Sequence, residues 1–146
     1  MSKQKLKLDD IAIEDSFFEE SSLVGISSVL PAYRLCWLLN RHFDVQFICE
    51  PGMTIISNKS EMTYYYPVYQ YEIPDSCFRH VIYKLKSENL SILPEINAID
   101  FLWLIQSPYH ESAATDIVFK LRKLPDVLLS QKIELSQLKN VKNLIL

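Results

Sequence analysis

Apolar residues are densest at positions 99–106, in the last third of the chain. Nearly every position of this segment is apolar, and Ser107 and Pro108 follow it. A strand that is apolar on both faces is typical of the centre of a sheet, so we predict a central strand here. Strand alternation places Ile99, Phe101, Trp103 and Ile105 on one face and Leu102 and Leu104 on the other.

A helical period follows at residues 112–123. Asp116 and Lys120 lie four positions apart, in the order that favours an ion pair on the exposed face. Pro125 ends the predicted helix, and residues 127–135 return to a strand pattern. Strand, helix and strand in this order predict a crossover that returns to one sheet. The predicted apolar face of the helix consists of Ala114, Ile117, Val118, Leu121 and Leu124.

An earlier helix is predicted from Pro31 to about Arg41. Proline suits the first turn of a helix because the amide hydrogen that it lacks would be unpaired there. Ser27 and Ser28 come just before, and a serine hydroxyl commonly caps a helix start. The predicted core face consists of Leu35, Leu38, Leu39 and His42, with Cys36 and Phe43 beside it.

Three strands are predicted after this helix, at residues 43–50, 63–73 and 78–86. Residues 51–62 have ordinary loop composition and form the predicted connection between the first two. Pro67 has no amide hydrogen for a sheet ladder, so we predict that the tyrosine-rich strand 63–73 lies at a sheet edge.

The first twenty residues combine an alternating segment with an acidic one. Residues 5–13 alternate between charged and apolar types and predict a first strand. Six carboxylates surround Phe17 and Phe18, which predicts a solvated loop. These carboxylates belong to Asp9, Asp10, Glu14, Asp15, Glu19 and Glu20.

These elements predict a single α+β domain over residues 1–146, with a mainly antiparallel sheet of five to six strands, two main helices and a C-terminal strand–helix–strand crossover. A chain of this length buries roughly 70% of its unfolded surface, so it requires no disulfide or metal for its core. We expect the final apolar triplet, Leu144 to Leu146, to dock on this core. By analogy alone, the crossover resembles half of a ferredoxin-like or ACT-type regulatory domain.

Composition argues against several classes of function. The net charge of −3 gives no general attraction for phosphate, so we expect no DNA partner. The two glycines, Gly25 and Gly52, stand alone and form no phosphate-binding loop, and no histidine or cysteine spacing is typical of a metal site. We therefore predict no cofactor, no metal and no catalytic motif.

Cysteine usage and the N-terminal sequence address location. The three cysteines are odd in number and unclustered, which favours reduced thiols in a cytoplasmic protein. The N-terminus has no apolar signal region, and the longest strongly apolar stretch is too short to cross a bilayer. We expect a cytoplasmic protein with no membrane partner.

Five tyrosines within residues 64–71 form the most unusual local composition. Alternation places Tyr65, Tyr69 and Tyr71 on one face of the predicted strand, and these three are candidate interaction residues. A stacking platform for RNA bases is an alternative, but few basic residues lie nearby. Half-buried tyrosines in an ordinary strand would produce the same pattern.

The segment from Leu93 to Phe101 holds a further set of candidates. Pro94, Glu95 and Asp100 stand at the spacing of a motif, IPExxxVDY, that defines a family of small bacterial proteins. Phe101 replaces the tyrosine of the motif, which removes any chemistry that requires a phenolic hydroxyl there. The chain therefore resembles the IPExxxVDY family of Bacteroidota, and this resemblance implies a cytoplasmic protein and no particular activity.

Asp100 is a carboxylate among apolar neighbours and so requires a partner. A buried structural pair with Arg34 or Arg79 is the first interpretation. The alternative is a functional pair with Glu95, acting as acid and base or binding a ligand.

These observations favour a non-catalytic protein-interaction or adaptor module that adds its tyrosine strand to an unknown protein partner. A small-ligand-binding regulatory domain of the ACT type is the main alternative. An enzyme using Glu95 and Asp100, and an RNA-associated protein, are further alternatives.

Overall fold

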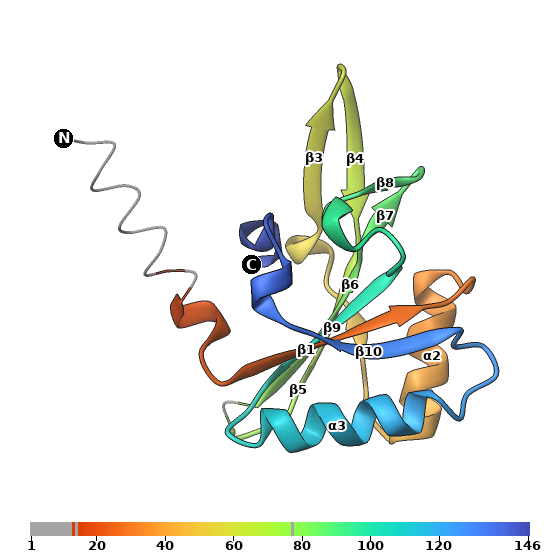
Figure 1. Cartoon of the computed structure of the whole chain (residues 1–146), viewed down its shortest axis with the longest axis vertical. Coiled ribbons are helices and arrows are strands. Elements are labelled where there is room, and N and C mark those ends of the chain that lie inside the picture. The colour runs from red at the N-terminus through yellow and green to blue at the C-terminus, as the bar shows by residue number, and fades with distance from the viewer. Residues whose placement is uncertain (1–12, 14, 77) are drawn as a thin grey trace.

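The computed structural model describes residue 13 and residues 15–146 other than Cys77. Its centre is a six-stranded antiparallel sheet in the order β10-β1-β9-β6-β5-β2 (Figure 1). The strands are β1 (Ser21–Ser27), β2 (Ile48–Cys49), β5 (Val68–Glu72), β6 (Arg79–Lys84), β9 (Phe101–Gln106) and β10 (Leu129–Ile133). The helices are α2 (Ala32–Phe43) and α3 (His110–Leu121). The predicted α+β class is confirmed.

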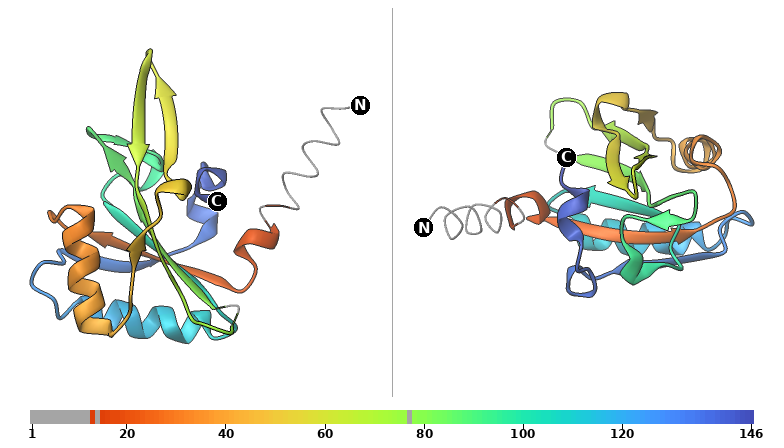
Figure 2. Two further views of the ribbon diagram at one scale, coloured as in Figure 1. Left: turned by 180° about the vertical axis from the view of Figure 1, so that it is seen from behind. Right: turned by 90° about the horizontal axis from the view of Figure 1, so that it is seen from above.

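Two short hairpins stand apart from this sheet. One consists of β3 (Ile55–Lys59) and β4 (Met62–Tyr66), and the other of β7 (Lys86–Ser87) and β8 (Leu90–Ser91). Figure 2 shows β3 and β4 rising from the end of the sheet. The phenol of Tyr66 donates to the Leu90 carbonyl over 3.1 Å and so links the two hairpins.

The C-terminal crossover has the predicted form. β9 and β10 each pair antiparallel with β1, which lies between them, and α3 joins them. The central position of β9 is confirmed, since it pairs with β1 on one side and β6 on the other. The predicted Asp116–Lys120 ion pair is also present, with 3.0 Å between nitrogen and oxygen.

The two faces of the sheet hold two apolar clusters. Phe101, Trp103 and Ile105 pack with the inner sides of α2 and α3, while Leu102 and Leu104 pack against the C-terminal segment. The predicted alternation is wrong at Ile99, because this residue packs with Leu102 rather than with Phe101. It precedes the first residue of β9, so strand alternation does not apply to it.

β1 was not predicted. Its last residues were interpreted as the entry into the first helix, whereas Ser21–Ser27 is a central strand. The predicted serine cap is also wrong, because Pro31 is the N-cap residue of α2 and no side chain caps the helix. The Ser28 hydroxyl instead donates to the Asp126 carbonyl over 2.7 Å.

The helix predicted from Pro31 is confirmed as α2, but its buried face differs. Buried residues are Ala32, Leu35, Cys36 and Leu39. The predicted face included His42, which is exposed, and Leu38, which is half-buried. The helix is therefore rotated about its axis, which brings Cys36 into the core.

The N-terminal predictions are tested only in part. The predicted strand 5–13 lies outside the described residues except for Ile13, which is helical. Residues 15–18 are also helical, and Phe18 is buried against the sheet, so the predicted solvated loop is wrong there.

The middle of the chain differs from the prediction at Pro67. The predicted strand 63–73 is divided into β4 and β5, and β5 lies inside the main sheet because β2 covers Tyr69 and Gln70. The predicted loop 51–62 contains strand β3, and the predicted strand 43–50 is reduced to the two residues of β2.

Of the predicted C-terminal triplet, Leu144 docks on the core, Ile145 is half-buried and Leu146 is exposed. Leu144 is fully buried, and its carbonyl accepts a 2.7 Å hydrogen bond from the buried phenol of Tyr83. Within the described part of the chain, no helix combines the length and the apolar character needed to span a membrane.

Candidate functional site

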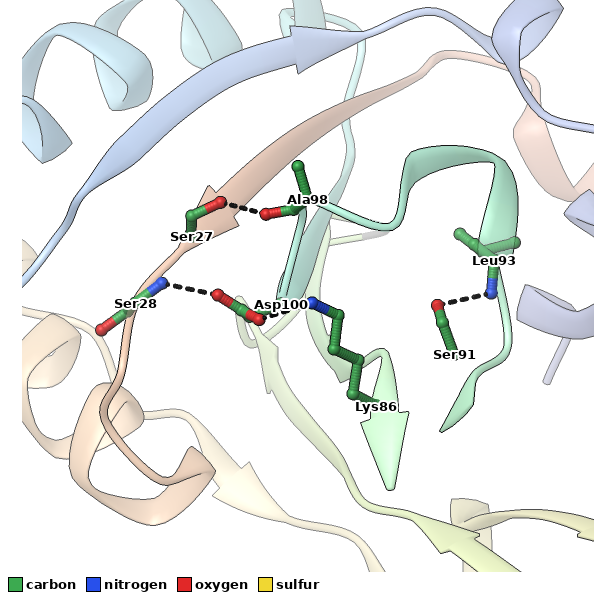
Figure 3. A network of polar contacts seen from close by, with 7 residues as sticks. All are labelled: Ser27, Ser28, Lys86, Ser91, Leu93, Ala98 and Asp100. Atoms are coloured by element: carbon green, nitrogen blue, oxygen red, sulfur yellow. Dashed lines mark hydrogen bonds and ion pairs between the residues drawn. The ribbon is translucent and has the colours of Figure 1, made fainter. Parts of the chain in front are cut away.

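Asp100 lies at the entrance to β9 and joins three segments of the chain (Figure 3). One carboxylate oxygen, Oδ2, accepts a hydrogen bond from the Ser28 amide over 3.0 Å. The other, Oδ1, lies 3.0 Å from the ammonium of Lys86. The Asp100 backbone also donates to the Ile26 carbonyl over 2.9 Å and accepts from the Leu85 amide over 3.0 Å.

The predicted arginine partners of Asp100 are wrong. Lys86 is the partner, and the pair is half-buried rather than buried, with side-chain exposures of 29% for Lys86 and 30% for Asp100. Arg79 instead donates to the amide oxygens of Gln106, over 2.9 Å, and Gln70, over 3.3 Å. The Ser28 amide supplies the second donor, so the carboxylate is satisfied without arginine.

The segment before Asp100 is held at several points. Pro94 is exposed and begins a 3₁₀ turn, Pro94–Ile96. The Ser27 hydroxyl donates to the Ala98 carbonyl, and the Ser91 hydroxyl accepts from the Leu93 amide over 3.0 Å (Figure 3). Backbone and hydroxyl groups therefore fix the motif segment against β1.

Glu95 holds a different part of the chain from Asp100. Its carboxylate accepts from the Asn140 side-chain amide, at 3.0 Å to Oε2, and from the Lys139 backbone amide over 3.3 Å. Glu95 thus ties the 3₁₀ turn to the C-terminal segment. The two carboxylates share no hydrogen-bond partner among the described residues, and this arrangement is that of two structural ties.

The three candidate tyrosines occupy two different sheets. Tyr65 lies on β4 and is 57% exposed, beside Ile56 of β3. Tyr69 and Tyr71 lie on β5 and are half-buried against the cluster under α2. The Tyr71 ring lies 5.9 Å from the imidazole of His80. Of the three tyrosines, Tyr65 alone presents most of its side chain to solvent.

Burial governs the titration of the groups in the core. It raises the pKa of the Cys36 thiol to about 12 and lowers the pKa of His80 to about 4. His80 accepts a hydrogen bond from the Trp103 indole at 3.0 Å, with the ring nitrogen Nδ1 as acceptor. At neutral pH the thiol is protonated and the imidazole is uncharged, so both groups serve packing.

An exposed aromatic surface on α2 was missed by the sequence analysis. Val29, Tyr33 and Trp37 are spaced by four residues, and their exposures are 84%, 66% and 54%. The Arg41 guanidinium follows at the same spacing and lies 4.9 Å from the Trp37 ring centre. Val29 precedes the helix, and we call Tyr33, Trp37 and Arg41 the α2 stripe. Their spacing is visible in the sequence, and this signal could have found them.

Among the described residues, no group of three His, Cys, Asp or Glu side chains is placed so that it could hold a metal ion. Fold and contacts define an antiparallel α+β protein with an exposed aromatic helix face. Comparison with known proteins found no matching family model, curated protein or solved structure. Membership of the IPExxxVDY family therefore stays a prediction.

Proposed function

We propose that this protein is a non-catalytic interaction or adaptor module of the cytoplasm, and that it binds a protein partner through the α2 stripe. The observation that carries the proposal is the exposure of Tyr33 and Trp37 one turn apart on α2, with Arg41 one turn further along the same face. Exposed apolar residues that stand singly are ordinary, whereas a contiguous row of them is typical of a binding surface.

The opposite face of α2 packs against the sheet and is not available to a partner. Leu35 and Leu39 are fully buried and anchor the helix on the sheet. The stripe therefore is not the core-facing side of a displaced helix. Tryptophan, tyrosine and arginine are also the residues most enriched among those that dominate binding energy at protein interfaces.

The charge of the helix indicates the chemistry of the partner. Residues 29–43 contain Arg34 and Arg41 and no carboxylate, although the whole chain has a net charge of −3. Both arginines are exposed. This surface fits a segment of a partner protein that carries acidic residues beside apolar ones. Two arginines on an acidic chain favour such a segment over RNA, which requires a more extended basic surface.

The sequence-based candidates contribute differently to this proposal. Tyr65, with its cross-strand neighbour Ile56, offers a smaller exposed apolar surface on the hairpin β3–β4. Tyr69 and Tyr71 pack within the sheet, and Glu95 and Asp100 tie chain segments together. We therefore assign binding to α2 and a structural role to the motif.

The test compares two exposed aromatic residues at different places. Tagged wild-type protein, Trp37→Ser and Tyr109→Ser are used to capture partners from native lysate, with and without nuclease. Tyr109 is the matched control, because it is 70% exposed and stands at the start of α3. The contact between Lys120 and Phe43 of α2 is made near the opposite end of α3.

We expect one stoichiometric, nuclease-resistant partner that Tyr109→Ser retains and Trp37→Ser loses. With the purified partner, Trp37→Ser should weaken the Kd by about 30-fold, as loss of a tryptophan at an interface centre commonly does. Equal retention by both variants would place binding elsewhere. Recovery of the protein alone would contradict the adaptor function, and a nuclease-sensitive partner would favour RNA.

A further inference from the structure

A cavity of about 320 Å³ lies where β1 and β10 meet the start of α3. It contains none of the candidate residues from the sequence analysis and none of the α2 stripe. Volumes of this order are at the lower end of those that hold small organic ligands. The lining residues used below are Ser22, His110, Lys132, Glu111, Phe18 and Ile133.

Ser22 and His110 form a polar pair in the wall of this cavity. The hydroxyl oxygen of Ser22 lies 2.6 Å from Nδ1 of His110, although the two residues are 88 positions apart. Ser22 belongs to β1, and His110 is the first residue of α3, which packs on that strand. Both side chains are half-buried, so each keeps part of its surface accessible to a ligand.

Both signs of charge also reach the cavity. Glu134 also lines the cavity, but its carboxylate already accepts from the backbone amide of Gln137. Lys132 contributes an ammonium and Glu111 a carboxylate. Neither side chain forms an ion pair with another described residue. Phe18 and Ile133 contribute apolar surface to the same cavity.

We propose that this cavity binds a small zwitterion with an apolar side chain, that is, a free α-amino acid such as leucine or phenylalanine. Lys132 pairs with the ligand carboxylate and Glu111 with its ammonium. The Ser22–His110 pair offers a hydroxyl and an imidazole for further hydrogen bonds, and the apolar wall receives the side chain. A dinucleotide is far too large for this volume. This binding is separate from the proposed adaptor function and does not depend on it.

The test follows the histidine resonances of the full chain by NMR. The sequence contains three histidines, and His110 is assigned by comparison with His110→Gln. Leucine and phenylalanine are titrated to about 20 mM, a range that covers weak small-ligand binding. We expect a saturable shift of the His110 ring resonances and none for His42, which is exposed on α2.

Two analogues of leucine test the proposed ligand class. Leucinamide lacks the carboxylate, and 4-methylpentanoate lacks the ammonium. Each is expected to weaken binding by tenfold or more relative to leucine, since each leaves one charged side chain unpaired. Binding of either analogue as tight as that of leucine would overturn the assignment to a zwitterion.

A pair of lysine variants tests the location. Lys132→Met is expected to weaken leucine binding by tenfold or more. Lys139→Met is the control, because Lys139 is also exposed but does not line the cavity. Lys132 is exposed, so its replacement leaves the fold intact. An unchanged affinity in Lys132→Met, or no His110 shift with either amino acid, would overturn the proposal.

Discussion

The carboxylate of Asp100 accepts a 3.0 Å hydrogen bond from the backbone amide of Ser28. This contact joins the end of β1 to the start of β9 across 72 positions of the chain. Ser28 is the first residue after β1, and Asp100 is the residue before β9. The Ser28 amide lies just beyond the last residue of β1, where the chain turns toward α2, and the Asp100 carboxylate accepts its hydrogen bond there.

Replacement of Asp100 should destabilise the protein. Asp100→Ala leaves the Ser28 amide without its acceptor and Lys86 without its partner, so we expect the free energy of unfolding to fall by about 1–3 kcal/mol. Asp100→Asn keeps an acceptor oxygen and loses only the attraction of a half-exposed ion pair, which should cost about 1 kcal/mol or less. Urea unfolding measures both changes.

Asp116 offers the matched control for this experiment. It pairs with Lys120 at the same 3.0 Å, but both side chains are more than half exposed, at 58% and 54%. Asp116→Ala should therefore change the unfolding free energy by no more than about 0.5 kcal/mol. If Asp100→Ala costs no more than this, the contact with Ser28 has no structural importance.

Glu95 should control the order of the C-terminal segment. Because its carboxylate accepts from Asn140 and from the Lys139 amide, Glu95→Ala should increase hydrogen exchange at Lys139 and in the following turn. Glu95→Gln retains one acceptor oxygen and should produce a smaller increase. Exchange measured by NMR distinguishes the two variants, and equal protection in wild type and Glu95→Ala would show that the docking is independent of this carboxylate.

Gly25 lies in β1 where a larger residue has no room. A β-carbon there would lie 3.0 Å from Cγ1 of Ile133 and 3.1 Å from Cδ1 of Ile99. We expect Gly25→Ala to lower the unfolding free energy by about 1–3 kcal/mol, as overpacked cores commonly do. In an Ile133→Ala background the close Cγ1 atom of Ile133 is absent and only the contact with Ile99 remains, so the same change should cost less. Additive costs in the double variant would contradict this explanation.

Elements with a complete local signal could be predicted from the sequence. The strand around Trp103 is apolar on both faces, and α3 has a clear apolar face with Leu121 near its end, so both were placed within two or three residues. β1 lacks such a signal, because Gly25 and three serines dilute its apolar residues. Its strand conformation depends on pairing with β9 and β10, which are distant in sequence.

Helix orientation and long-range partners were harder to predict for a related reason. The helix α2 carries apolar residues on two sides, and only contact with the sheet decides that Cys36 is buried while Trp37 is exposed. Asp100 was correctly expected to need a partner. Its partner, Lys86, is the first residue of β7, and the sequence contains no signal that distinguishes this lysine from the arginines.

Stability should fall in mild acid because of His80. Burial lowers its pKa from 6.5 to about 4, so between these values the unfolded chain binds a proton that the folded protein excludes. The contribution of His80 to the free energy of unfolding is therefore fully present above pH 6.5. It decreases as the pH falls toward 4, by up to about 3 kcal/mol. Urea unfolding between these pH values measures the decrease.

His80→Gln can still accept from the Trp103 indole and does not titrate, so its stability should vary less over this range. His42→Gln is the control, because His42 is exposed on α2, and it should keep the wild-type dependence. A pH dependence that is the same in His80→Gln and wild type would assign the acid sensitivity to other groups.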